Sequence, residues 1–379
     1  MPAPSVFSAT MAGNATELER RLIEQIKRGG PITFRDFMQA ALYDPELGYY
    51  NTHRQKFGAE GDYYTSSNVH PAFGAVLAKA LCEMWANESV ADSNSLDIVE
   101  FGPGNGQLSL DIISALQSEH PTTFDNLRYL LVETSPVLRS VQHEKLIDFK
   151  EHVQWQSLDE LTSNPIKGIV LSNEFIDALP VHRARFRNHS IHELYVTTGE
   201  DRGEVHLAPL WSHPSSRRLT DYLERFGIPL RDDQIVEINL DAVDWLERIS
   251  RILRGGLLVT IDYGDRVQDL YTPNRKSGTL RCFHRHELSD RPFEQVGDQD
   301  ITSSVNFTDL IEFGQDHGFK FVNLERQTSF LIRNGLIDRI VAEHASVESV
   351  DSLATRLAIK NLFVPGGLSD SFRVLIQRR

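Results

Sequence analysis

Three glycines at alternating positions form the part of this sequence best suited to holding a small ligand. Gly102, Gly104 and Gly106 follow the apolar run 96–101 and precede residues 107–116, whose apolar side chains recur at helical spacing. This order predicts a buried strand, a tight turn and a helix. A ligand could approach the glycine backbone closely, and the N–H groups at the helix start would favour an anion or another hydrogen-bond acceptor. A strand-to-helix turn with no ligand is the alternative.

The spacing of the glycines distinguishes between two classes of nucleoside cofactor. A dinucleotide loop has the pattern G-x-G-x-x-G, whose third glycine would fall at Gln107 in this chain. The chain instead has G-x-G-x-G headed by an acid, which resembles motif I of class I S-adenosylmethionine (SAM) methyltransferases. We therefore predict that SAM is the cofactor and that it is bound by Glu100, Gly102, Pro103, Gly104 and Gly106. An NAD-dependent oxidoreductase is the less favoured alternative.

Polar residues at the ends of later predicted strands extend this cofactor site. Glu133 ends the strand 129–133, where a carboxylate can accept both ribose hydroxyls of an adenosine. A solvated strand end is the alternative for this residue. Ser157 and Leu158 follow the third strand, where an adenine would be flanked, and Asn173 ends the fourth strand. We add these four residues to the predicted cofactor-binding set.

Two acids directly after the fourth strand are the candidate catalytic residues. Glu174 and Asp177 are three residues apart and would share one face of a helical turn. Methyl transfer from a sulfonium is a direct displacement, so the protein mainly aligns the reacting groups and stabilises charge on the acceptor. The two carboxylates could hold a guanidinium, which would suit an arginine acceptor. The alternative is that both acids only interact favourably with the dipole at a helix N-terminus. Residues 262–264 could line the same cleft.

Other reactive residues do not form a recognisable site. His284 and His286 alternate with Arg285 on a loop for which no regular structure is expected, so we predict no metal site. Cys82 lies beside the apolar stripe of a predicted amphipathic helix that Pro71 opens, which favours a core residue over a nucleophile.

The composition limits the partners and the compartment that we expect. The 379 residues are 40% hydrophobic and 24% charged, as in ordinary globular proteins. A formal net charge of -14 argues against nucleic acid or an anionic membrane surface as a partner. Two distant cysteines favour a reducing compartment, and neither a bilayer-spanning run nor a signal-peptide pattern is present. We expect a cytoplasmic protein without membrane insertion; the oligomeric state is not predicted.

The order of the predicted elements indicates an α/β fold with a Rossmann-like, mostly parallel sheet and helices on both of its faces. Strands and helices alternate from residue 96 to residue 262, and the strand 235–238 is expected to belong to this sheet. Two short helices precede the first strand. We predict that residues 1–70 form a helical lid with a cofactor-closing loop, and that residues 71–379 form the core.

Two insertions are predicted within this core. Period-two alternation of apolar residues predicts a β-rich, substrate-side insertion at about 181–233. The polar segment of about 264–306 is too long for a passive connection and is a candidate substrate loop. A last helix is predicted at 350–362.

A series of sequence blocks in one order resembles the MidA-type SAM-dependent methyltransferases. The blocks are YDPELGYY (43–50), GDYYT (61–65), EFGPGNG (100–106), SNEFIDALPV (172–181), VEIN (236–239), IDYG (261–264), GTLRC (278–282) and QDIT (299–302). The mitochondrial members of that family are protein arginine methyltransferases that act in respiratory complex I assembly. The resemblance implies a class I methyltransferase, a protein acceptor, and a loop ending at Thr65 that closes over SAM. A SAM-binding assembly factor that acts mainly by holding a partner is the alternative.

Two places depart from the pattern of that family. Ser67 and Asn68 stand where Pro-Glu is common, and Ser304 and Asn306 stand where a histidine and an aspartate often follow. We expect both places on substrate-side loops, where they would alter the acceptor rather than SAM binding.

Overall fold

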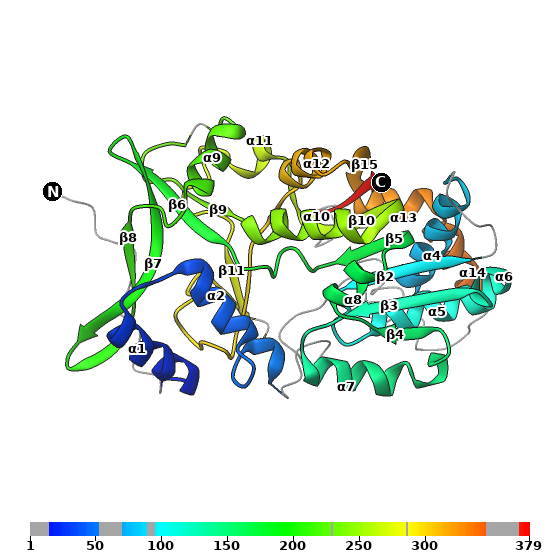
Figure 1. Ribbon diagram of the computed structural model, residues 1–379, viewed down its shortest axis with the longest axis horizontal. Helices are drawn as coiled ribbons and strands as arrows, with labels where there is room; N and C mark the ends of the chain where they lie inside the picture. Colours follow the sequence, from blue (N-terminus) through cyan, green and yellow to red (C-terminus); the bar gives the residue numbers. More distant parts are fainter. Residues whose placement is uncertain (1–14, 53–69, 89–94, 229, 286, 346–370) are drawn as a thin grey trace.

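The computed structural model describes residues 15–52, 70–88, 95–228, 230–285, 287–345 and 371–379. Figure 1 shows a large sheet with helices on both faces and, beside it, a smaller β-rich part that packs with the first two helices.

The large sheet has eight strands. In spatial order they are β15 (Lys320–Arg326), β16 (Phe372–Arg378), β10 (Leu253–Asp265), β5 (Ile166–Asn173), β2 (Leu96–Phe101), β3 (Leu127–Val132) and β4 (Val153–Trp155), with β14 (Val305–Asn306) beside β10. The strands from β10 to β4 pair in parallel, whereas β16 pairs antiparallel with both of its neighbours. Parallel strands that are buried on both faces are continuous apolar runs, as the sequence indicated. The carboxyl ends of β2, β3, β5 and β10 therefore meet at one edge of the sheet.

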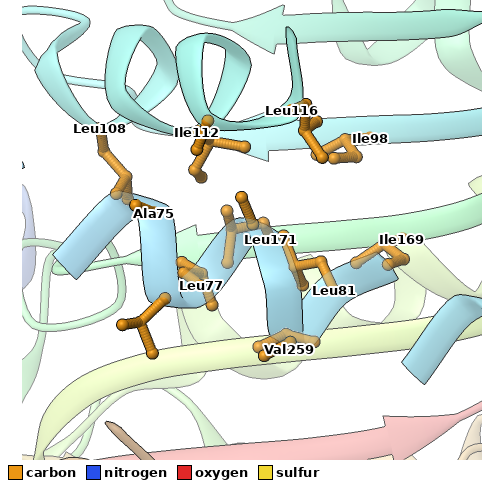
Figure 2. Packing of buried hydrophobic residues seen from close by; sticks show 14 of the residues in the cluster. Ala75, Leu77, Leu81, Ile98, Leu108, Ile112, Leu116, Ile169, Leu171 and Val259 are labelled. Carbon is orange, nitrogen blue, oxygen red and sulfur yellow. The ribbon is translucent and has the colours of Figure 1, made fainter. Parts of the chain in front are cut away.

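Helices α4 (Ala72–Ala86) and α5 (Gln107–Glu119) cover one face of this sheet, with α13 (Gln327–Arg333) and α14 (Leu336–Ala345) beside α4. Figure 2 shows Leu81 of α4 close to Val259 of β10 and to Ile169 of β5. The helix α4 was predicted to be amphipathic, but most of its length is buried because α5, α14 and the sheet enclose it.

The opposite face of the sheet is covered by α8 (Leu158–Ser163), α10 (Leu240–Ile252) and α12 (Phe307–Asp316). Successive strand residues face opposite sides, so Val170 packs with these helices whereas Ile169 and Leu171 pack with α4 and α5. The other short elements between β2 and β4 are α6 (Pro121–Phe124), α7 (Pro136–Lys145) and η2 (Ile147–Phe149), and Phe124 and Phe149 pack against the cluster of α4 and α5.

The smaller part contains the predicted β-rich insertion. Its five-stranded sheet has the order β1 (Ile32–Thr33), β7 (Ser190–Asp201), β6 (His182–Arg187) and β9 (Ile235–Ile238), with β8 (Glu204–Ser212) paired to β7. The prediction that strand 235–238 belongs to the large sheet is wrong, because β9 pairs antiparallel with β6. Its apolar pattern suits burial in either sheet and does not encode the partner. On one face lie α1 (Glu17–Gly29) and α2 (Phe34–Tyr43), and on the other α9 (Arg217–Arg225).

The segment predicted as a polar loop at 264–306 is largely structured. It contains α11 (Val267–Leu270) and a three-stranded sheet of β12 (Glu287–Ser289), β11 (Arg281–His284) and β13 (Asp300–Thr302). Cys282 of β11 and Ile301 of β13 are register partners, and both are buried in the apolar cluster of α1 and α2. The helix predicted at 350–362 lies outside the described residues.

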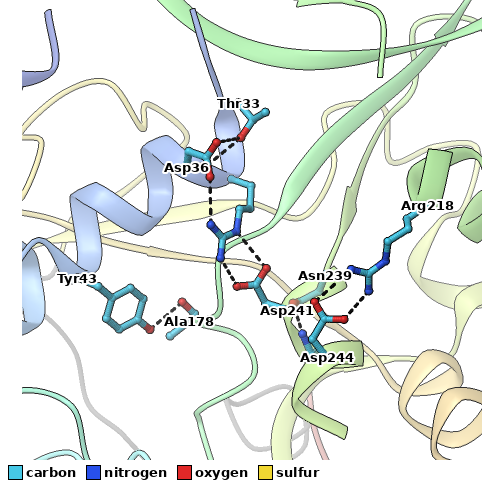
Figure 3. Close-up of polar contacts among 10 residues, drawn as sticks. Thr33, Asp36, Tyr43, Ala178, Arg218, Asn239, Asp241 and Asp244 are labelled. Atoms are coloured by element: carbon cyan, nitrogen blue, oxygen red, sulfur yellow. Dashed lines mark hydrogen bonds and ion pairs between the residues drawn. The ribbon is translucent and has the colours of Figure 1, made fainter. Parts of the chain in front are cut away.

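One ion pair and one hydrogen bond join α2 to the part of the fold that contains the large sheet. The Arg35 guanidinium on α2 donates to both carboxylate oxygens of Asp241 on α10, at 3.1 and 2.6 Å (Figure 3). The Tyr43 hydroxyl, at the end of α2, donates to the Ala178 carbonyl at 3.0 Å. The N-terminal helices are thus fixed to the segment that follows β5.

Candidate active site

The glycine turn after β2 adopts a backbone that favours glycine. Gly102, Gly104 and Gly106 have φ of 62°, 56° and 77°, in the left-handed region where a Cβ is disfavoured. A Cβ on Gly102 would lie 2.7 Å from Cδ2 of Phe175. The Gln142 side chain donates to the Gly104 carbonyl at 2.7 Å and fixes the turn from α7. The sequence-based prediction of strand, tight turn and helix is therefore confirmed here.

A cavity of about 460 Å³ lies at the carboxyl ends of β2, β3, β5 and β10. It is bordered by nine of the predicted site residues, namely Glu100, Gly102, Pro103, Gly104, Glu133, Leu158, Asn173, Glu174 and Asp177. The predicted residue Thr65 lies outside the described part of the chain. Residues far apart in the sequence thus surround one cavity because parallel strands end at the same edge.

Two predicted cofactor-binding residues lie behind the cavity wall. Gly106 precedes the first turn of α5, and a Cβ there would lie 3.3 Å from Cγ of Gln142. Ser157 forms a capping box with Glu160: its Oγ accepts the Glu160 N–H at 3.2 Å, and Glu160 Oε2 accepts the Ser157 N–H at 2.7 Å. Both residues shape backbone turns beside the site, and direct contact with a cofactor stays a prediction for them.

The two acids at the first strand ends have different environments. Oε2 of Glu100 accepts hydrogen bonds from Ser109 at 2.6 Å and Tyr129 at 2.7 Å, which ties β2 to α5 and β3. Burial raises the pKa of Glu100 to about 6, and these two hydrogen bonds oppose the shift. Glu133 accepts the Ser135 N–H at 2.8 Å through Oε1, and burial raises its pKa as well.

The turn after β5 is held from the neighbouring strand. Oδ2 of Asp262, on β10, accepts the N–H groups of Ile176 and Asp177 at 3.0 and 3.2 Å. The Asp262 side chain is fully buried, and its Oδ1 accepts the N–H of Tyr263 at 2.9 Å. Glu174 occupies the left-handed region with a φ of 50°. The turn that carries the candidate catalytic acids is therefore built by hydrogen bonds to β10 rather than by a helical repeat.

The acids of this turn influence one another's protonation. Asp177 is 5% exposed; burial, followed by the charge of Glu174, raises its pKa to about 7. Burial and the charge of Asp177 raise the pKa of Asp262 well above its ordinary value. Asp177 can therefore exchange a proton near neutral pH, which an ordinary surface aspartate does not do.

Sequence reasoning named Tyr263 of the wall opposite the glycine turn, within residues 262–264, and missed most of the other residues. Tyr43 and Tyr50 stack with ring centroids 5.4 Å apart, and the Tyr50 hydroxyl donates to Asp300 Oδ1 at 3.0 Å. Further residues that border the cavity there are Ala178, Tyr263, Arg281, Phe283, Asp300 and Thr302. The signal for several of them was present, because they lie in the family-like blocks 43–50 and 299–302. The sequence pattern gave no reason to predict Trp245 as a cavity residue, because it looks like any other apolar residue of a helix.

The remaining reactive residues stay apart from the cavity. Among the described residues, no group of three His, Cys, Asp or Glu side chains could hold a metal ion. His286 lies outside those residues, and Nδ1 of His284 is 2.8 Å from the Asp298 carbonyl. Burial raises the pKa of Cys82 to about 11 and that of Cys282 to about 12, so both thiols are weak nucleophiles.

The departures from the family pattern do not lie at the described cavity wall. The Asn306 side chain donates to Tyr222 at 3.2 Å and to Asp309 at 2.6 Å, and its oxygen caps α12. It is a buried packing residue, so the expectation of a substrate-side position is wrong for Asn306. Ser67 and Asn68 lie outside the described residues.

The cavity fits a SAM-type nucleoside by the features of its own wall. A glycine turn lies at the start of α5, the half-buried carboxylate of Glu133 follows β3, and Leu158 borders the side where an adenine would lie. A mostly parallel sheet with this site at its carboxyl edge is the architecture of a class I SAM-dependent methyltransferase.

The comparisons with known proteins agree with this class. Residues 76–324 match the family Methyltransf_28, described as "Putative S-adenosyl-L-methionine-dependent methyltransferase", and the chain belongs to this family. It is similar to the "Protein arginine methyltransferase NDUFAF7 homolog, mitochondrial" of Drosophila melanogaster, with 27% identity over 80% of this chain and 71% of the relative. The corresponding protein of Danio rerio is 28% identical over 85% of this chain and 77% of that protein.

A solved structure extends the agreement to the cofactor. A "likely methyl transferase" from Burkholderia thailandensis, bound to S-adenosyl-homocysteine (SAH), superposes with a TM-score of 0.84. It is 26% identical and covers 96% of this chain and 92% of its own. The predicted family, fold class and cofactor are therefore confirmed: the protein is a class I SAM-dependent methyltransferase.

The comparisons correct one prediction. We expected a cytoplasmic protein from its cysteine usage and the absence of a signal-peptide pattern, but the matched relatives are named as mitochondrial proteins. Few cysteines and an acidic composition are compatible with more than one compartment, so they do not support the cytoplasmic assignment. In the described part of the chain, no helix combines the length and the apolar character needed to cross a bilayer.

Proposed function

We propose that this methyltransferase transfers the methyl group to an arginine side chain of a protein. The observation that carries the proposal is the pair Glu174 and Asp177, which borders the same cavity as the glycine turn. Carboxylates bind the planar guanidinium through charge-assisted hydrogen bonds. The printed names of the relatives, protein arginine methyltransferases, support the same acceptor.

The site assignments of the proposal divide the cavity into two ends. At the cofactor end, Gly102, Pro103, Gly104 and Asn173 would hold SAM, Glu133 would accept its ribose hydroxyls, and Leu158 would flank its adenine. Glu100 would support the turn, with Gly106 and Ser157 behind it. Thr65 would belong to a loop that closes the site. When bound, SAM supplies an electrophilic methyl group.

At the acceptor end, Glu174 and Asp177 would position the guanidinium and stabilise its positive charge. A carboxylate beside the reacting nitrogen stabilises the cation and orients it, which is the main contribution a protein makes to a direct displacement. With a pKa of about 7, Asp177 can also accept the proton that the acceptor nitrogen releases.

Transfer of radiolabelled methyl from SAM into a lysate that lacks this protein tests the proposal. We expect label in protein, recovered as methylarginine after hydrolysis, and its loss with Glu174→Gln and Asp177→Asn while SAH still binds. Asp159→Asn, an exposed residue of α8, is the control and should leave labelling unchanged. SAM binding without any labelled arginine would contradict the proposal and would favour a partner-binding assembly factor.

We also propose that residues 1–70 act as a lid over a core of residues 71–379, with insertions at about 181–233 and 264–306. Supporting this division, Tyr43 and Tyr50 border the cavity from outside the large sheet. Hydrogen exchange should slow in residues 34–52 when SAH and an acceptor peptide are added. Unchanged exchange there would contradict a lid.

A further inference from the structure

The acceptor end of the cavity contains three polar atoms that form no hydrogen bond of standard geometry among the described residues. They are Oδ1 of Asp177, the hydroxyl of Tyr263 and Oγ1 of Thr302. All three residues border the cavity, and the Asp177 and Thr302 residues are only 5% and 4% exposed. An unsatisfied buried polar atom costs about 1–3 kcal/mol. Three poorly satisfied atoms at one wall therefore favour a bound group that completes their hydrogen bonds.

The three residues come from different elements that the fold holds together. Asp177 lies in the turn after β5, Tyr263 on β10 and Thr302 on β13. The Asp177 carbonyl accepts the N–H of Ser303 at 3.0 Å, which joins the end of β13 to this turn. Burial raises the pKa of Asp177 and Tyr263; hydrogen bonding from the Tyr263 hydroxyl to Asp177 opposes the first shift, and hydrogen bonding from the Thr302 hydroxyl to Tyr263 opposes the second. The Tyr263 hydroxyl is thus a neighbour of both other groups.

The charges around these atoms favour a cation. Glu174 and Asp300 border the same part of the cavity, and Asp262 lies behind it. The cationic side chain on this wall is Arg281, an exposed residue whose register partner on β13 is Thr302. Acids therefore outnumber cations in the described wall. Tyr43, Tyr50 and Phe283 add aromatic faces, which attract a delocalised cation.

We propose that Tyr263 and Thr302 complete, with Asp177, a subsite that binds the guanidinium of the acceptor. A guanidinium presents five N–H donors in one plane, so the two hydroxyl oxygens can accept donors that the Glu174 and Asp177 carboxylates do not. The hydroxyls would select a guanidinium over a compact ammonium, which has fewer donors. This inference rests on the proposed arginine acceptor and assigns two further binding residues to it.

Binding of a small acceptor analogue tests this subsite. The probe is N-acetyl-L-arginine amide, titrated calorimetrically into the full chain saturated with SAH. N-acetyl-L-citrulline amide, which has a similar shape and no charge, is the matched control ligand. We expect Thr302→Val and Tyr263→Phe each to raise the Kd of the arginine probe about tenfold, because each removes one hydrogen bond to a charged group. Thr302→Ser keeps the hydroxyl and should bind as the unaltered chain does.

Two further measurements separate binding from folding. The Kd of SAH and the melting temperature of the SAH complex should change little in Thr302→Val and Tyr263→Phe. In methyl transfer to poly-L-arginine, both variants should raise KM more than they lower kcat, and the preference over poly-L-lysine should fall. If one variant does not fold, the other and Thr302→Ser still decide the result.

The outcomes test two separate claims, the guanidinium subsite and the proposed transfer of methyl to arginine. An unchanged Kd for the arginine probe in both hydroxyl variants would overturn the subsite, and would mean that ordered water satisfies these atoms. Equal binding of the citrulline probe, or no binding of the arginine probe to the unaltered chain, would overturn it as well. Failure of the unaltered chain to label arginine in the lysate refutes the proposed function instead, whatever the hydroxyl variants do.

Discussion

Gly102 stands where the chain leaves β2 for α5, with a φ of 62° and the Phe175 ring directly beside its missing Cβ position. Gly203, in the turn between β7 and β8, has a comparable φ of 83° and nothing within 4 Å of the same position. Gly203 and Gly102 therefore illustrate two different reasons why a position requires glycine. At Gly203 only the backbone requires it, whereas at Gly102 the packing of the cavity wall requires it too.

The first prediction compares alanine at these two positions. Both substitutions should lower the free energy of unfolding by about 1–2 kcal/mol because of the left-handed backbone. Only Gly102→Ala should also weaken SAH binding, by about tenfold or more, because the added methyl displaces Phe175 at the cavity wall (about 1.4 kcal/mol per tenfold change). Urea unfolding and calorimetry measure the two effects. Equal SAH affinities of the two variants would contradict the close packing seen at Gly102.

The second prediction concerns the pH dependence of Asp177. Its carboxyl is buried beside Glu174, Asp262, Tyr263 and Tyr43, and its pKa is raised to about 7. Below that pH the group is protonated and neutral, so it binds a cationic acceptor poorly; above it the carboxylate is present. We expect kcat/KM for an arginine peptide to rise up to about tenfold per pH unit below the pKa and to level off above it.

The charge of Glu174 provides an internal check on that assignment. Because this charge is the second cause of the raised pKa, Glu174→Gln should shift the midpoint of the kcat/KM profile to lower pH, even though its overall activity falls. A profile with the same midpoint in the variant would show that another group titrates.

At the scale of elements, one side chain on β10 holds the turn after β5 that carries the candidate catalytic acids. Asp262 on β10 accepts three backbone N–H groups, two from the turn after β5 and one from Tyr263. The turn also begins with Glu174 in a left-handed conformation, whose N–H donates to the Ile261 carbonyl at 2.9 Å. Thus the position of the candidate catalytic acids depends on β10 as much as on β5.

The third prediction is that Asp262→Ala strongly destabilises the protein. It leaves buried N–H groups of Ile176 and Asp177 without a partner, at about 1–3 kcal/mol each, partly offset by relief of the repulsion between Asp262 and Asp177. We expect the free energy of unfolding, measured in urea, to fall by about 2–4 kcal/mol. Asp265→Asn is the control on the same strand. It breaks an ion pair with Arg373 in which Asp265 is 39% exposed, and should change stability by less than about 1 kcal/mol.

The helices and strands also show which parts of the fold the sequence patterns could predict. The apolar runs and the glycine turn predicted β2, β3, β5 and β10 and the cofactor edge, because burial of a parallel sheet depends on residue type alone. The same reasoning assigned strand 235–238 to the wrong sheet, since the pairing of β9 with β6 is set by the connection that precedes it. The wall formed by Tyr50, Asp300 and Thr302 was not predicted, because contacts across 250 residues leave no local periodicity.

At the scale of the whole molecule, the cavity lies between two parts of the fold. The large sheet supplies the glycine turn, Glu133 and the turn after β5. The wall opposite the turn comes from α2, the segment after it, and the small sheet of β11 and β13. The register of that sheet places Arg281 opposite Thr302 and Phe283 opposite Asp300, so these four residues share the face toward the cavity. If the acceptor binds as proposed, its binding depends on how the two parts are joined.

The last prediction tests the ion pair that joins these parts. Arg35 of α2 and Asp241 of α10 form two hydrogen bonds with side chains 28% and 25% exposed, and the bond to Asp241 raises the pKa of Arg35. A double-mutant cycle with Arg35→Ala and Asp241→Ala should give a coupling energy of about 1–2 kcal/mol in urea unfolding. The pair Arg28 and Glu24 within α1 is the control; its side chains are 78% and 68% exposed, so its coupling should stay below about 0.5 kcal/mol.

The functional effect of the same variants should fall on one end of the cavity. Loosening α2 shifts Tyr43, which contacts Ala178 in the segment after β5, while the glycine turn and Glu133 remain in the large sheet. The KM for an arginine peptide should therefore rise several-fold, and the Kd of SAH should stay within about twofold of its original value. Equal losses of both affinities would mean that the contact of α2 with α10 supports the whole cavity, and that the acceptor end is not separately positioned by the N-terminal helices.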